Sequence, residues 1–298
     1  MKKIIIYASI ALTFGLIPLS SVAQEFAVKA YGDIGLGKAL SLSSGLPGMT
    51  TKSSSNAFGV GFGYSFWKKD NNSLEANIGI GYRMASATFD VTGFEYNYAA
   101  PAAADEDGNS YQRYTSLSDV NQKVDMGYFN IPIYLQYQYR ITSWLGVHAD
   151  LGFGLGFKCS GKVGSTQGMA YSYGVYPEYD NLVIDSDYLN DFGNRDLANA
   201  KAVGADIKGF SASILAGVGF EFYVSGPVSI DLSVNYNAGL TGVFSSKYAI
   251  GPTSKITSEN APVTYTVAEG TTVKSLTDYT TKSRLSPLSV RVGINYRF

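Results

Sequence analysis

The sequence predicts an all-β fold, an eight-stranded antiparallel up-and-down β-barrel that spans a membrane. Three observations predict it. Apolar and polar side chains alternate with a period of two along eight segments of the chain. Several of these segments exceed the ~9–11 residues that a strand needs to cross a bilayer. The connections between them alternate between short and long, which is typical of transmembrane barrels.

The composition agrees with a barrel whose outside is apolar and whose inside is polar. Only 16% of the residues are charged, 14% are aromatic, and 33 are glycine. The net charge of -1 provides no field that would attract nucleic acid, so we exclude that class of partner. The single cysteine excludes a disulfide framework, and with the single histidine it excludes a Cys/His zinc cluster. We expect no cofactor.

The N-terminal segment has the features of a secretory signal peptide. Two lysines precede an apolar stretch over 4–17, which is shorter than the ~20 residues of a spanning helix. Ser21 and Ala23 place small residues at the positions that a cleavage after Ala23 requires. We therefore expect a signal peptide over 1–23 and one barrel domain over 24–298.

The eight expected strands lie at 26–38, 54–67, 73–89, 123–140, 144–158, 210–224, 228–240 and 288–298. In the first strand, aliphatic residues alternate with Lys29 and Asp33. The second alternates Phe, Tyr and Val with glycine, and the third alternates aliphatic residues with Glu75 and Arg83. The fourth changes phase along its length, so we expect a β-bulge near Tyr128.

The last four expected strands show the same alternation. The fifth sets leucine and phenylalanine against His148, Asp150 and glycines, and the sixth sets apolar residues against serine, glycine and Glu221. The seventh sets aliphatic residues against serine, asparagine and aspartate. The eighth is the clearest, with one wholly apolar face and another that carries Arg291 and Arg297.

The expected connections place both chain termini at one end of the barrel. The short turns lie at 68–72, 141–143 and 225–227, and the long loops at 39–53, 90–122, 161–209 and 245–284. We expect the short turns in the periplasm and the long loops outside the cell. Aromatic residues gather at both strand ends, as in the two girdles of a lipid-embedded barrel. At the short-turn end these are Phe66, Trp67, Tyr137, Tyr139, Trp144, Phe220, Phe222, Tyr296 and Phe298, and at the loop end Phe89, Tyr128, Phe157, Phe210 and Phe244.

Two segments carry a family resemblance. Residues 128–139, YFNIPIYLQYQY, are similar to a strand of the PorT-like outer-membrane β-barrel family of Bacteroidetes. Residues 290–298, with Tyr296 and Phe298, resemble the C-terminal signal that the barrel assembly machinery reads. The chain also resembles the OmpA/OmpX size class of small barrels. The resemblance implies a multi-pass protein of the Gram-negative outer membrane, with lipids and the assembly machinery as partners.

The expected inward faces carry ionisable residues of both signs. They are Lys29, Asp33, Glu75, Arg83, His148, Asp150, Lys158, Glu221, Asp231, Arg291 and Arg297. An eight-stranded barrel has an interior just wide enough for side chains, and buried charges need partners. We therefore expect a network of salt bridges that fills the lumen. The alternative is a path for protons or ions.

Other candidate sites are weaker. His148 and Asp150 share a strand face, but no serine nucleophile accompanies them, so we expect no catalysis. The lone Cys159 is expected to behave as a small hydrophobe. The acidic run over 105–109 predicts a hairpin turn. We expect no metal site; the weak calcium candidates are Asp185, Asp187 and Asp191, in a loop that otherwise indicates a solvated surface.

The sequence predicts architecture better than activity. The favoured function is a structural or interaction role at the cell surface, with loops 161–209 and 245–284 contacting an extracellular ligand. One alternative is a porin-like channel for small solutes, which would need more strands for a water-filled lumen. The second alternative is an outer-membrane enzyme, against which the loop end offers no histidine.

Overall fold

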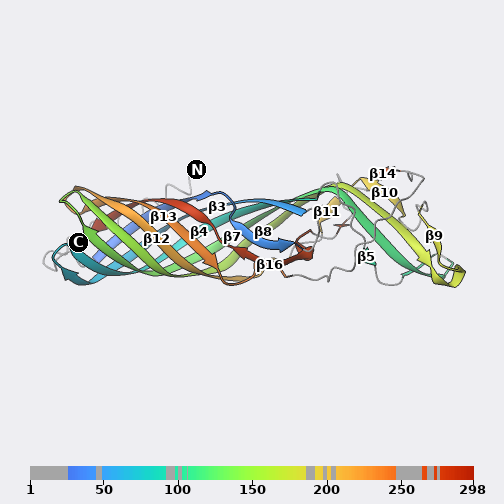
Figure 1. Cartoon of the computed structure of the whole chain (residues 1–298), viewed down its shortest axis with the longest axis horizontal. Helices are drawn as coiled ribbons and strands as arrows, with labels where there is room; N and C mark the ends of the chain where they lie inside the picture. Colours follow the sequence, from blue (N-terminus) through green and yellow to red (C-terminus); the bar gives the residue numbers. More distant parts are fainter. Residues whose placement is uncertain are drawn as a thin grey trace.

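The computed structural model describes residues 26–44, 49–91, 98–99, 103–105, 107–185, 192–196, 200–202, 206–245, 264–266, 272–273 and 276–298. The expected signal segment lies outside these residues. The molecule is elongated, with a barrel at one end and a narrow sheet that continues from it at the other (Figure 1). Among the described residues, no helix is long and apolar enough to cross a membrane.

The barrel is a closed ring of eight strands, which confirms the predicted fold class. The ring consists of β1 (Phe26–Leu36), β3 (Met49–Lys69), β4 (Asn72–Val91), β7 (Ser110–Arg140), β8 (Leu145–Tyr176), β12 (Phe210–Ser225), β13 (Val228–Gly239) and β17 (Leu288–Arg297). Each strand pairs antiparallel with its neighbours in chain order, and β17 returns to pair with β1. No sheet edge therefore remains within the ring.

Shorter elements lie at the loop end. They are β2 (Leu40–Ser44), β5 (Tyr98–Ala99), β6 (Ala103–Ala104), the 3₁₀ turn η1 (Pro177–Tyr179), β9 (Leu182–Ile184), β10 (Gly193–Asp196), β11 (Ala200–Ala202), β14 (Thr264–Thr266), β15 (Thr272–Val273), η2 (Leu276–Tyr279) and β16 (Thr280–Leu285). β2 and β16 form a separate two-stranded sheet. The other short strands pair, directly or through one another, with β7 and β8.

Both ends of the ring meet at the short-turn end, as the even strand number requires. The backbone amide of Phe298 donates to the carbonyl of Phe26 at 3.0 Å, and the amide of Phe26 donates back at 3.3 Å. Short turns join β3 to β4, β7 to β8 and β12 to β13.

The outward face of the ring is apolar and exposed. Ile78 and Ile80 are each 52% exposed, Val218 is 63% and Leu151 is 65%. Such a continuous apolar surface is unfavourable in water, whereas it matches the band that a transmembrane barrel presents to lipid. The inward face carries polar residues and glycine, as the alternation predicted.

Two strands are far longer than the sequence predicted. β7 has 31 residues and β8 has 32, so residues 110–122 and 161–176, which we expected in loops, belong to strands. At about 3.3 Å per residue each spans roughly 100 Å, three times the ~30 Å hydrocarbon core. Beyond the membrane both faces of a strand can be hydrated, so the apolar alternation that identifies a strand is weak there. The bulge expected near Tyr128 is confirmed by a register shift between Gly127 and Tyr128.

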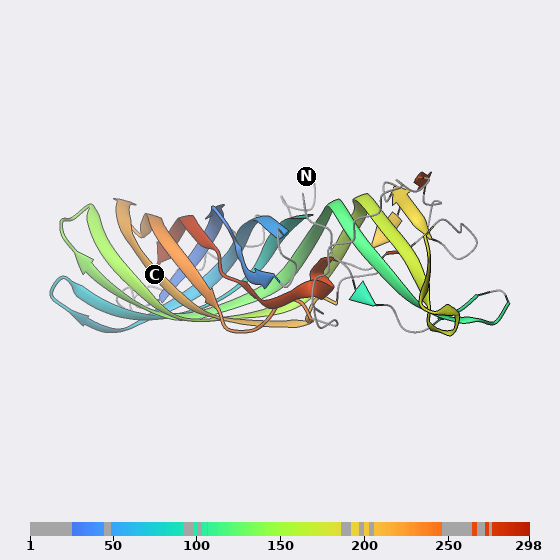
Figure 2. The same ribbon diagram turned by 45° about the vertical axis from the view of Figure 1, so that its right-hand side comes forward.

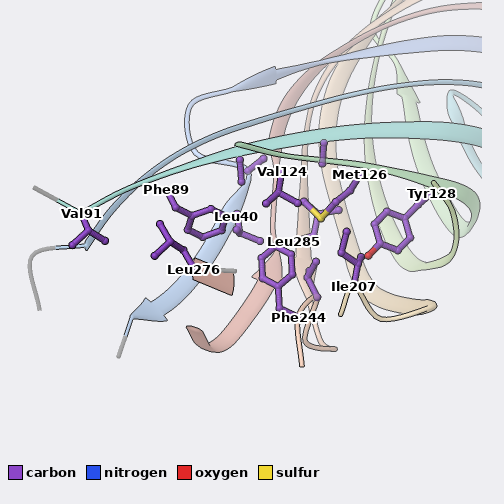
Figure 3. Close-up of a cluster of buried hydrophobic side chains, with 14 of the residues drawn as sticks. Leu40, Phe89, Val91, Val124, Met126, Tyr128, Ile207, Phe244, Leu276 and Leu285 are labelled. Atoms are coloured by element: carbon purple, nitrogen blue, oxygen red, sulfur yellow. The ribbon is translucent and has the colours of Figure 1, made fainter. Parts of the chain in front are cut away.

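The side-chain pattern of β4 inverts where the strand passes the mouth of the barrel. Up to Arg83 its inward side chains are polar or glycine, but beyond this point the inward positions hold Ala85, Ala87, Phe89 and Val91, all buried. These four contribute to an apolar cluster over the mouth, which we call the cap (Figure 3). Its other members are Ala39, Leu40, Val120, Val124, Met126, Tyr128, Ile207, Val243, Phe244, Leu276 and Leu285.

The cap corrects the predicted girdle at the loop end. Phe89, Tyr128 and Phe244 are at most 4% exposed and lie within the cap, so they do not face lipid. Only Phe157 and Phe210, each 45% exposed, match the prediction, and their ring centroids lie 5.6 Å apart. At the short-turn end, Phe66, Trp67, Tyr137, Tyr139, Trp144 and Phe220 are exposed.

Candidate functional site

The lumen holds three groups of charged side chains, stacked from the short-turn end to the cap. The first group lies nearest the chain termini. Glu221 on β12 forms a two-pronged ion pair with Arg297 on β17, in which Nη2 lies 3.0 Å from Oε2. Lys29 on β1 pairs with Glu75 on β4, and Arg297 Nη2 lies 3.9 Å from Glu75 Oε2.

Neutral side chains complete this first group. Ser229, Asn295 and Gln138 all donate hydrogen bonds to Glu221, the Asn295 amide at 3.0 Å. Glu75 fits because Gly63 lies opposite it, and a Cβ atom there would lie 2.5 Å from Glu75 Oε1. The first group therefore has two acids and two bases, and neutral donors complete the surroundings of Glu221, as buried ion pairs require.

The second group is centred on His148 of β8. Its Nδ1 lies 3.2 Å from Asp150 Oδ1 and 3.0 Å from the Gln136 amide, and its Nε2 lies 2.5 Å from Asp231 Oδ2. The hydroxyl of Ser233 donates to Asp231 at 2.9 Å and not to the imidazole. The imidazole is thus held between two carboxylates, and among the described residues no hydroxyl makes the contact with it that nucleophilic catalysis uses.

The third group lies closest to the cap. Arg291 donates to Asp33 through Nε at 2.7 Å and through Nη2 at 3.1 Å, and its guanidinium lies 4.3 Å from the Tyr31 ring centroid. Arg83 is buried in the same region. Lys158 is exposed, and its Nζ donates to the Ile207 carbonyl at 2.7 Å. The structure therefore places Lys158 at the mouth of the barrel and not within the lumen.

A second candidate site lies beyond the cap, where β7 and β8 remain paired as far as Gln112 and Val175. We call this part of the sheet, with its short added strands, the protrusion (Figure 2). Tyr111, Tyr176 and Phe192 form a small buried core within it. The rings of Tyr114 and Tyr173 stack at 5.0 Å with an interplanar angle of 10°.

The acidic run over 105–109 forms the expected turn, between β6 and the start of β7. The Asp105 carboxylate accepts hydrogen bonds from the backbone amides of Asn109 at 2.8 Å and Asp107 at 3.1 Å. Desolvation alone would raise the pKa of Asp105, but the hydrogen bonds from Asn109 and Asp107 hold that pKa below its ordinary value. Gly108 adopts a φ of 82°, which favours glycine.

The weak calcium candidates do not come together in one site among the described residues. Asp185 accepts a hydrogen bond from the Tyr171 hydroxyl at 3.1 Å, while Asp187 and Asp191 lie outside the described residues. Within the part of the chain that the structure describes, no three His, Cys, Asp or Glu side chains gather in a way that could hold a metal ion. Cys159 is free and exposed near the mouth of the barrel.

Tyr296 and Phe298, which the sequence associates with barrel assembly, lie beside the seam between β1 and β17. Tyr296 is in register with Val28, and Phe298 stacks on Phe26 with centroids 6.3 Å apart. Sequence reasoning missed the cap entirely. In the sequence after Met84, the apolar side chains of β4 pass from the outward positions to the inward ones. This change in the alternation is the signal that could have revealed the cap.

The model of the family described as the outer membrane protein beta-barrel domain matches residues 22–245. The chain belongs to this family. It is therefore an integral, multi-pass β-barrel of the outer membrane. No curated protein matches the chain.

Solved structures of other outer-membrane proteins are similar at low identity. The attachment invasion locus protein Ail of Yersinia pestis, solved with the heparin analogue sucrose octasulfate, has 10% identity and a TM-score of 0.33, with 92% of this chain and 97% of that chain covered. OprG of Pseudomonas aeruginosa has 11% identity and a TM-score of 0.36, with 93% and 96% covered. The translocator domain of NalP from Neisseria meningitidis has 13% identity and a TM-score of 0.26, with 98% and 95% covered. At these scores the family assignment rests on the family model.

Proposed function

We propose that this outer-membrane barrel acts as a surface interaction protein, in which a closed, side-chain-filled barrel holds the protrusion outside the cell for contact with an extracellular ligand. The observation that carries the proposal is the length of β7 and β8, which stay paired far beyond the ring. A protein that only anchored itself in lipid would not need this extension.

The tip of the protrusion offers a surface for such contact. Tyr179, Leu182 and Val183 are 52%, 50% and 56% exposed, and they follow one another closely around η1 and β9. Apolar side chains grouped on a surface outside the membrane are typical of interaction sites. η1 and β9 continue directly from β8, and β9 pairs back onto β8, which supports a display of these side chains at the far end of the protrusion.

A photo-reactive amino acid at Val183 in living cells tests the proposal. We expect a cross-linked product at Val183 that is absent when the same amino acid replaces Thr142 in the short turn. The product should weaken when Tyr179 and Leu182 are both changed to Ser, because these changes remove apolar contact area without touching the barrel. Cross-linking that is equal at both positions, or that is unchanged by the two substitutions, would contradict the proposed role of the tip.

A small-solute channel has less support. The cap lies over the loop end of the lumen, and the three charged groups occupy most of the lumen below it, leaving only small cavities. We propose that the lumen network stabilises the closed barrel and provides no path for solutes or ions.

We extend the proposal to targeting and lineage. We propose that residues 1–23 are removed on export, so that the mature protein isolated from outer membranes begins at Gln24. On the motif over 128–139 we place the chain in the PorT-like branch of the family, and we assign Tyr296 and Phe298 to recognition by the assembly machinery. Changing Phe298 to Ser should then reduce the amount inserted in the outer membrane without changing the amount exported.

A further inference from the structure

A small polar cavity lies in the outer lumen, between the Asp33–Arg291 ion pair and the cap. Its walls hold Arg83, Tyr128, Asn130, Ser211, Ser213 and Asn237, with Leu285 of the cap over it. The cavity has room for a particle about the size of a water molecule. Gly154 helps to keep this space open, because a Cβ atom there would lie 2.7 Å from Ser213 Oγ.

Among the lumen cations that the structure describes, Arg83 is the one without a contacting carboxylate. Its residue is 8% exposed, yet among the described residues its guanidinium makes no hydrogen bond and no ion pair. The other three lumen cations with a permanent charge each contact a carboxylate: Lys29 contacts Glu75, Arg291 contacts Asp33 and Arg297 contacts Glu221.

The carboxylate that acts most strongly on Arg83 is already engaged. Asp33 interacts electrostatically with Arg83, but both of its oxygens accept hydrogen bonds from Arg291. A guanidinium has five N–H donors in a fixed planar fork and cannot lose its charge at neutral pH. A buried charge without a partner in direct contact is costly, so Arg83 favours a counter-charge within contact distance, which no described side chain supplies.

The rest of the cavity wall suits an anion. No carboxylate lines it among the residues that the structure describes. The hydroxyl of Ser211 and the amides of Asn130 and Asn237 can donate hydrogen bonds into it, whereas the Ser213 hydroxyl donates to the Gly154 carbonyl at 3.5 Å. The small volume excludes a phosphate or sulfate group. We propose that this cavity binds one halide-sized anion, such as chloride, with Arg83 as its principal ligand. This site is independent of the proposed surface function.

To test this, the full chain is refolded in detergent at constant ionic strength, in buffers that contain no chloride or other halide, and bromide replaces a large organic anion stepwise. We expect the Tm of the unmodified protein to rise with bromide, and crystals grown from the same solution to show an anomalous bromide peak beside Arg83. Arg83→Gln should weaken bromide binding by roughly thirtyfold or more, because it removes the charged partner of a buried anion.

Two further variants keep the test decisive. Asn130→Asp is nearly isosteric and places a carboxylate in the cavity, so it should raise the Tm without halide and remove the dependence on bromide. Lys52→Gln removes an exposed cation at the same end of the barrel and should leave that dependence unchanged. The same dependence on bromide in the unmodified and Arg83→Gln proteins, or bromide density only at other positions, would overturn the proposal.

Discussion

Changing Glu221 to Ala should destabilise the barrel by about 3 kcal/mol. The substitution removes the two-pronged partner of Arg297 and leaves donors on Ser229, Asn295 and Gln138 without their acceptor. Breaking a buried ion pair by removing one partner costs about 3–5 kcal/mol. We take the lower end because Arg297 is 12% exposed and keeps Glu75 within 3.9 Å, so water and a second carboxylate relieve part of the loss.

A double-mutant cycle isolates the ion pair from the other lost contacts. Urea unfolding in lipid vesicles gives the free energies of unfolding for Glu221→Ala, Arg297→Ala and the double variant. We expect the double variant to lose less than the sum of the single losses, by about 1–3 kcal/mol. Glu178→Ala, the same substitution at an exposed position, is the matched control and should change little. A loss below about 1 kcal/mol for Glu221→Ala, or a coupling energy near zero, would refute the ion-pair reasoning.

Three other predictions follow from the same structure. Ile78→Arg should destabilise by about 2–4 kcal/mol because Ile78 faces the middle of the bilayer. Thr88→Arg, outward on the same strand but beyond the mouth and opposite Lys52 and Lys123, should cost no more than about 1 kcal/mol; equal losses in refolding titrations would remove the membrane placement. Protease added to whole cells should cut near 179–183 and spare 141–144, and cleavage confined to 141–144 would reverse the topology. Planar-bilayer recordings of the purified protein should show no stepwise conductance, and steady channel openings would instead favour a solute pathway through the lumen.

Period-two alternation was enough to predict the ring because the membrane makes the two faces of each strand chemically opposite. Ile78 and Glu75 differ in burial as the alternation required, and the bulge beside Tyr128 was found by its change of phase. The same reasoning failed above the membrane. There the contrast between the faces weakens, so the outer halves of β7 and β8 resembled loops, and Phe89 was assigned to lipid although it is buried in the cap.

The lumen partners could be predicted as a set but not as pairs. Alternation places Lys29, Glu75 and Arg297 on inward faces, yet it does not give the stagger between strands that decides which side chains meet. The unpartnered state of Arg83 depends on Arg291 occupying both oxygens of Asp33, from strands at opposite ends of the sequence. Which cation is left without a contacting carboxylate therefore depends on three-dimensional geometry that no local sequence pattern encodes.

The seam between β1 and β17 sets an order on folding. Asp33 and Arg291, which face each other across it, are separated by 258 positions. The seven other neighbour pairs of the ring join strands that follow one another along the chain, so they can zip together progressively. The last pairing alone must wait for the C-terminal strand. Until that strand arrives, the partly built sheet has two open edges with unpaired backbone groups, the arrangement most prone to aggregation. We therefore expect a chain with this topology to need protection during transit, and its ring to close only when the C-terminal strand pairs with β1.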